Sequence, residues 1–319
     1  MATAGSRNRE VGMPPHPWPH RLALTTTGAT FVLILAGGVV TNTGSGMAVP
    51  DWPNTFGHNM FLYPWSKMVG GIFYEHVHRL IASLVGSLTL TLAVLLWAFE
   101  PRHWLRGLGV AALIAVAVQG ILGGLRVVLA QETLAIVHGA FAHAFFGLVA
   151  AIALFTSPSW HAPISVISST DARRLRHLAL LTTIGLYVQV GFGTLVTHRG
   201  AWLEAHLFFA ALLSVAVILL GFRIVPGRSR WPELVRTTEI LRALWVVQLI
   251  LGLGAYVAKF HAALLPVGAG LSLALPVSHR LTGGLMLIAS LVLALRISRR
   301  TGWPAGARDG EPVTPQVTA

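Results

Sequence analysis

The segment EHVHRLIASLVGSLTLTLAVLLWA, residues 75–98, decides the class of fold. From Leu80 to Phe99 it contains no charged residue, and about 20 apolar residues are enough for a helix to cross a bilayer. Only 11% of the 319 residues are charged, against about 25% in a soluble domain. The sequence predicts an all-α integral membrane protein with eight transmembrane helices, at residues 22–42, 76–98, 106–128, 134–156, 175–197, 202–224, 238–260 and 272–296.

The net charge of +12 is distributed as a topology signal and does not indicate nucleic acid as a partner. Seventeen arginines fall at the two ends of the chain or in the even-numbered loops, and only six Lys and Arg residues fall on the other side. Positive residues concentrate on the cytoplasmic side of membrane proteins. We therefore expect both termini to be cytoplasmic and the basic residues to meet anionic lipid.

A short motif repeats along the odd-numbered spans. Gln-x-x-x-Gly begins at residues 119, 189 and 248, and the first span keeps the glycine, Gly37, but has Leu33 in place of the glutamine. The motif taken alone is typical of close helix packing. Its repetition predicts two duplicated four-helix bundles, residues 22–160 and 161–300. We expect a cytoplasmic segment before them, residues 1–21, and a disordered cytoplasmic tail after them, residues 301–319.

Each even-numbered span has a histidine near its start: His78, His138, His206 and His279. Alternate helices start at the same face of the membrane, so the four side chains are expected at similar depth. One intramembrane histidine alone is more often a hydrogen-bonded core residue, but ionisable groups inside spans are usually functional. Imidazole binds iron, and helix bundles hold cofactors between facing helices. Four regularly placed histidines predict ligands for two hemes.

Three further residues extend this pattern. Arg79 follows His78 and Arg280 follows His279, where each could pair with a heme propionate. The alternative is an ordinary topology signal or lipid headgroup binding. Glu75 precedes His78 by three residues, which puts both on one helix face. Its carboxylate has no counterpart in the second half, so the first half is predicted to be the reactive one. Alternatively, Glu75 only pairs with Arg79.

The connection from about Thr43 to Tyr74 is rich in aromatic residues and proline. A long ordered loop is often functional. A lid or partner surface and an aromatic belt at the headgroup level are both open interpretations.

Three segments and one histidine together resemble heme A synthase: TGSGMAVPDWP at residues 43–53, EHVHR at 75–79, QGILGG at 119–124, and His138. The resemblance extends over all eight spans. It implies oxidation of the C8 methyl of heme O to a formyl group by successive hydroxylation, for cytochrome oxidase. It also implies that His78 and His138, with Arg79, flank the substrate heme O, and that Glu75 is catalytic. His206 and His279, with Arg280, would hold a permanent heme b.

One departure from the family concerns a cysteine pair that many members carry in the first outer loop. The corresponding places here are Val49 and Thr55, and the chain has no cysteine. Thiol chemistry and disulfides are therefore excluded. The resemblance further implies a bacterial inner-membrane location and, as partners, heme O synthase and oxidase assembly factors; a homo-oligomer is a further expectation. The alternative functions are a non-enzymatic di-heme b electron carrier and a transporter, the latter expected to have helices broken at mid-membrane.

Overall fold

The structure, a computed structural model, describes residues 16–167, 170–261 and 268–301. Residues 1–15 and 302–319, which make up most of the predicted terminal segments, lie outside the described residues. All eight predicted spans are confirmed as long apolar helices: α1 (Pro17–Asn42), α2 (Gly71–Phe99), α3 (His103–Val128), α4 (Glu132–Phe155), α6 (Thr170–Arg199), α7 (Leu203–Ile224), α8 (Pro232–Phe260) and α9 (Ala269–Arg300).

Most of the helices begin several residues before the apolar runs that predict them. Pro17 and Pro232 occupy first-turn positions of α1 and α8, where a missing N–H is no loss and the fixed φ already suits a helix. The polar first turns extend the helices beyond the apolar stretch. Four short helices complete the described secondary structure: α5 (Pro158–His161), η1 (Met60–Leu62), η2 (Trp65–Lys67) and η3 (Val225–Gly227).

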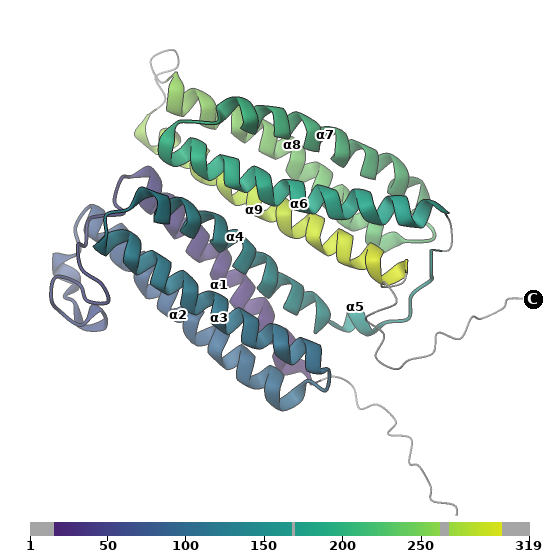
Figure 1. Ribbon diagram of the computed structural model, residues 1–319, viewed down its shortest axis with the longest axis horizontal. Coiled ribbons are helices and arrows are strands. Elements are labelled where there is room, and N and C mark those ends of the chain that lie inside the picture. Colours follow the sequence, from purple (N-terminus) through teal and green to yellow (C-terminus); the bar gives the residue numbers. More distant parts are fainter. Residues whose placement is uncertain (1–15, 168–169, 262–267, 302–319) are drawn as a thin grey trace, which may run out of the picture.

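The long helices form two groups of four (Figure 1). In the first, α1 to α4 pack in a ring in which α4 returns to α1, and α6 to α9 pack in the same order. Each group has its own buried apolar core. The groups meet where α1 and α4 contact α9 and where α4 contacts α6. This arrangement is the one a duplication would produce, and the duplication itself stays a prediction.

The outer surface of the helices is apolar. Large side chains such as Trp97, Leu181 and Phe222 are 65%, 66% and 75% exposed. A soluble protein rarely exposes a continuous apolar surface of this kind. Lipid is therefore the solvent for this surface, and the chain is a multi-pass membrane protein.

Candidate functional site

Each of the four predicted histidines packs against a glycine of the preceding long helix. A Cβ atom built on Gly37 would lie 3.1 Å from Cε1 of His78, and one on Gly123 would lie 3.2 Å from Cε1 of His138. The corresponding distances are 3.5 Å for Gly193 and His206 and 2.9 Å for Gly252 and His279. The glycine of the repeated motif therefore makes room for an imidazole ring, which the packing interpretation alone did not indicate.

The glutamine of the motif holds the histidine-bearing helix. Nε2 of Gln119 donates to the backbone carbonyl of His138 at 3.1 Å, and Nε2 of Gln189 donates to that of His206 at 2.9 Å. Gln248 differs, because its Nε2 lies 3.4 Å from Nε2 of the His279 ring. The glycine of each motif leaves space for one histidine ring. In two of the three repeats the glutamine also binds the backbone of that histidine.

The four histidine rings share one environment. The Nδ1 atom of each is buried against the preceding long helix. Each ring also interacts with the backbone of one residue of that helix, four positions before the glycine: Leu33, Gln119, Gln189 and Gln248. The long contact with Gln248 is the one hydrogen-bond contact of these rings with a described side chain. The donor set fits heme iron, for which imidazole is a common axial ligand.

The second pair has a ring separation that suits one metal between two imidazoles. The ring centroids of His206 and His279 lie 6.2 Å apart. A metal binds imidazole nitrogen at about 2.0 Å, and the nitrogen lies roughly 1.1 Å from its ring centroid, so opposed ligands have centroids about 6 Å apart. The spacing of the two rings is therefore the one that a single iron between them would require.

The first pair lines a cavity of about 570 Å³. His78 of α2 and His138 of α4 lie in its wall with Gly37 and Gly123. Ligand pockets of about 300–1,000 Å³ are typical for organic cofactors and substrates. Glu75 also lines the cavity, and it is the only carboxylate among the described lining residues.

The outer loop forms part of the same cavity wall through Trp52, Pro53, Asn54 and the segment 59–61. The Trp52 ring packs so tightly on Gly124 of α3 that a side chain at Gly124 would overlap it. The structure therefore places this loop over the cavity, as a lid would be, while exposed Phe61 and Trp65 remain compatible with an aromatic belt.

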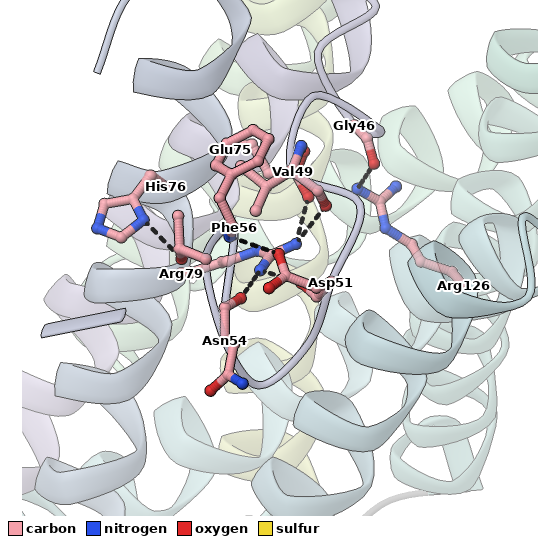
Figure 2. A network of polar contacts seen from close by, with 10 residues as sticks. Gly46, Val49, Asp51, Asn54, Phe56, Glu75, His76, Arg79 and Arg126 are labelled. Atoms are coloured by element: carbon pink, nitrogen blue, oxygen red, sulfur yellow. Dashed lines mark hydrogen bonds and ion pairs between the residues drawn. The ribbon is translucent and has the colours of Figure 1, made fainter. Parts of the chain in front are cut away.

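Glu75 and Arg79 connect α2 to this loop (Figure 2). The backbone N–H of Val49 donates to Oε2 of Glu75 at 2.9 Å, and Nη2 of Arg79 donates to Oε1 of Glu75 at 2.8 Å. Arg79 also donates to three loop carbonyls, those of Val49, Asp51 and Asn54. Both oxygens of the Glu75 carboxylate are therefore fixed. The Arg79 guanidinium binds the loop carbonyls and also forms the expected ion pair with Glu75.

The loop is stabilised further by Asp51 and Thr55. The Asp51 carboxylate accepts the backbone N–H groups of Phe56 and Gly57 at 2.8 and 2.7 Å. Its partial burial raises the pKa, but these hydrogen bonds and the charge of Arg79 outweigh that effect and hold the pKa of Asp51 below its ordinary value. Oγ1 of Thr55 is hydrogen-bonded to Nδ1 of His76 at 3.1 Å. His76 therefore has a structural role, because it holds Thr55 of the loop against α2.

Comparison with known proteins identifies the family. The family model COX15-CtaA, described as cytochrome oxidase assembly protein, matches residues 20–205, which is more than half of the chain. The chain belongs to this family. The match includes Glu75, His78 and His138, and ends before His206.

Individual relatives agree with the family assignment. A protein of Shouchella clausii named heme A synthase is 29% identical over 194 residues, 59% of this chain and 62% of that protein. One of Alkalihalophilus pseudofirmus is 32% identical over 114 residues, 34% of this chain and 36% of that protein, and has the same name. A third, from Bacillus pumilus, is 24% identical over 250 residues, 76% of this chain and 74% of that protein. The chain thus matches less than two thirds of the first two relatives.

Val49 and Thr55, which the resemblance matches to a cysteine pair, both attach the loop to α2. Val49 is fully buried and supplies the N–H that holds Glu75. Thr55 is also fully buried and binds His76. The loop is therefore fixed to α2 at both places without a disulfide.

Sequence reasoning did not single out every charged or histidine side chain of the cavity wall. Arg126, His143 and His198 also line the cavity. Arg280, which was expected beside the second pair, reaches this cavity too. His143 follows His138 by five residues and so offered a weak signal, whereas the positions of His198 and Arg280 depend on contacts between the two bundles.

Proposed function

We propose that this family member is a heme A synthase, which oxidises the C8 methyl of heme O to a formyl group by two successive hydroxylations. The observation that carries the proposal is the fixed carboxylate of Glu75 in the wall of a cavity that also contains His78 and His138. The relatives' name, heme A synthase, gives the product, and heme O as the substrate follows from the family resemblance of the sequence. The reaction belongs to the supply of heme A for cytochrome oxidase.

The two histidine pairs are proposed to bind different hemes. We assign His78 and His138 to the substrate heme, because their cavity contains the carboxylate. We assign His206 and His279, whose rings are spaced for one iron, to a permanent heme b. A bound heme b supplies one-electron redox chemistry. The histidines themselves orient the groups and exclude other ligands from the iron.

Glu75 is the group placed to deal with charge at the reacting methyl carbon. Oxidising a methyl to a formyl group removes electrons, which an external acceptor must take up, and positive charge develops at that carbon when electrons leave before protons. A preorganised carboxylate can accept a proton or stabilise such charge. The hydrogen bond from Val49 and the ion pair with Arg79 fix its direction before substrate enters.

The geometry disfavours both alternatives. A transmembrane electron carrier usually holds its hemes near opposite faces, whereas each of these four histidines lies within about three turns of the start of its helix, at the same end of both bundles. A transporter is expected to have helices broken at mid-membrane. The long helices run continuously through the described residues, with Pro276 inside α9.

The same proposal covers location and partners. We place the protein in the bacterial inner membrane with both termini cytoplasmic, because the basic residues concentrate at those ends. Heme O synthase would supply the substrate and oxidase assembly factors would receive the product. Membrane lipid surrounds the helices, and a homo-oligomer is compatible with their exposed apolar surface.

Heme extracted from membranes of cells that make heme O tests the reaction. Formyl heme is expected in membranes of cells that contain the protein, and no formyl heme is expected in membranes of cells that lack it. Glu75→Gln should keep the Soret absorbance of bound heme and lose the formyl product. A variant with undiminished product would remove Glu75 from the mechanism, and no product with the wild-type protein would refute the activity itself.

A further inference from the structure

The first cavity carries more positive than negative charge. Its described lining contains Arg79, Arg126 and Arg280 but only one carboxylate, Glu75. Arg79 and Glu75 pair at 2.8 Å, so two positive charges remain, on Arg126 and Arg280. Neither forms an ion pair with a carboxylate among the described residues. Because a buried cation without an anion is costly, the cavity is suited to a ligand with two negative charges.

Arg280 reaches this cavity from the other bundle. It follows His279 on α9, but consecutive helical residues point about 100° apart. The His279 ring faces Gly252 of α8, whereas the Arg280 side chain crosses to α1. Its Cδ lies 3.9 Å from a Cβ built on Gly38, and its Nη1 lies 3.5 Å from Oγ1 of Thr41.

Two adjacent glycines of α1 make this crossing possible. Gly37 faces α2 and leaves room for His78. Gly38 faces α9, where a Cβ would lie 3.4 Å from Val277 and would also approach Arg280. Helix α1 can therefore hold the ring of one bundle and the guanidinium of the other at the same level.

Arg126 of α3 supplies the second cation. Its Nη2 donates to the carbonyl of Gly46 at 3.2 Å, which fixes the guanidinium at the start of the outer loop. A guanidinium has five N–H donors, so this one hydrogen bond leaves others for a ligand. Residues Thr194 and His198 of α6 also line the cavity, and they show that the second bundle contributes more than Arg280 to its wall.

We propose that Arg280 and Arg126 bind the two carboxylates of the ligand in this cavity, and that the second bundle thereby completes the binding site of the first. The inference rests on the proposed function, in which the ligand is a heme with two propionates. It assigns Arg280 to the substrate site, although the residue directly follows a ligand of the heme b site. Arginine suits this role because its paired donors match carboxylate geometry.

Titration of heme-depleted protein with iron protoporphyrin IX and with its dimethyl ester tests the assignment. The ester has the same ring and iron but no propionate charge. In a His206→Ala/His279→Ala background, only the first site should titrate in the Soret band. The free acid should bind about 10-fold to 100-fold more tightly than the ester, as for one or more charge-assisted hydrogen bonds. Adding Arg280→Met should lower the ratio several-fold, Arg280→Met together with Arg126→Met should bring it close to one, and Arg280→Lys should restore part of what Arg280→Met loses.

Two controls separate the possible outcomes. Arg296→Met, near the other end of α9, removes a cation that bonds Thr237 and should leave the ratio unchanged. In a His78→Ala/His138→Ala background, Arg280→Met should also leave the ratio of the second site unchanged. An altered ratio at the second site, or an unaltered ratio at the first site, would contradict the role proposed for Arg280. Either result would leave the proposed function standing. Failure of the first site to bind either porphyrin would overturn the proposed function with it.

Discussion

The backbone N–H of Val49 donates a hydrogen bond to Oε2 of Glu75 at 2.9 Å, so the outer loop holds a carboxylate of helix α2 in the wall of the cavity. The loop is a cover and also a positioning element. An uncharged backbone N–H group therefore fixes the direction of the carboxylate.

Glu75→Gln should keep the heme and lose turnover. The amide is nearly isosteric but cannot accept a proton or stabilise positive charge as a carboxylate does, and losing such a group typically costs 10²–10⁴-fold in rate. Formyl heme per bound heme, measured by pigment extraction, should fall by about 100-fold or more. Glu100→Gln, at the far end of α2 beside Arg102, is the matched control and should keep its activity.

Gly123→Ala should displace the His138 ring. A Cβ there would lie 3.2 Å from Cε1 of His138, whereas a Cβ on Gly107 of the same helix meets nothing within 4 Å. We expect Gly123→Ala to lower heme occupancy of the first site several-fold and Gly107→Ala, away from the cavity, to retain it. Equal heme contents of the two variants, measured by Soret absorbance per protein, would contradict the close-packing argument.

Alanine variants of the two histidine pairs should differ in the heme that the purified protein retains. His206→Ala and His279→Ala should each remove the permanent heme b, so that the purified protein contains less heme. His78→Ala and His138→Ala should keep that heme and lose product. If all four variants retained the same pigment and activity, the division into substrate and cofactor pairs would be wrong.

Acid should loosen the outer loop through Asp51. Its pKa is lowered by folding, so the carboxylate stabilises the folded loop above its ordinary pKa of 3.8 and this contribution is lost as the pH falls through the lower folded value. Hydrogen exchange at the amides of Phe56 and Gly57, corrected for the intrinsic pH dependence, should therefore accelerate in that range. Asp51→Asn should exchange faster at neutral pH and show little of the acid transition.

The sequence predicted the eight spans because a bilayer imposes one requirement that can be read locally. Each span must be long, apolar and internally hydrogen-bonded, as in the segment from Leu80 to Phe99. The same local reading predicted His78, His138, His206 and His279 as ligands, because each recurs once per helix pair at a similar distance from the helix start. Glu75 was predicted beside them because it lies one helical turn from His78, and these roles stay predictions.

Contacts between distant parts of the chain could not be read in this way. Arg280 follows His279 in sequence, yet the 100° step along a helix and the space left by Gly38 direct it into the other bundle. The loop contact of Val49 with Glu75 joins residues whose pairing depends on how a long connection folds back. Composition and spacing thus determined the membrane fold and the histidine pattern, while only tertiary packing decided which bundle each charged side chain serves, because a side chain's direction depends on the free space left by its neighbours.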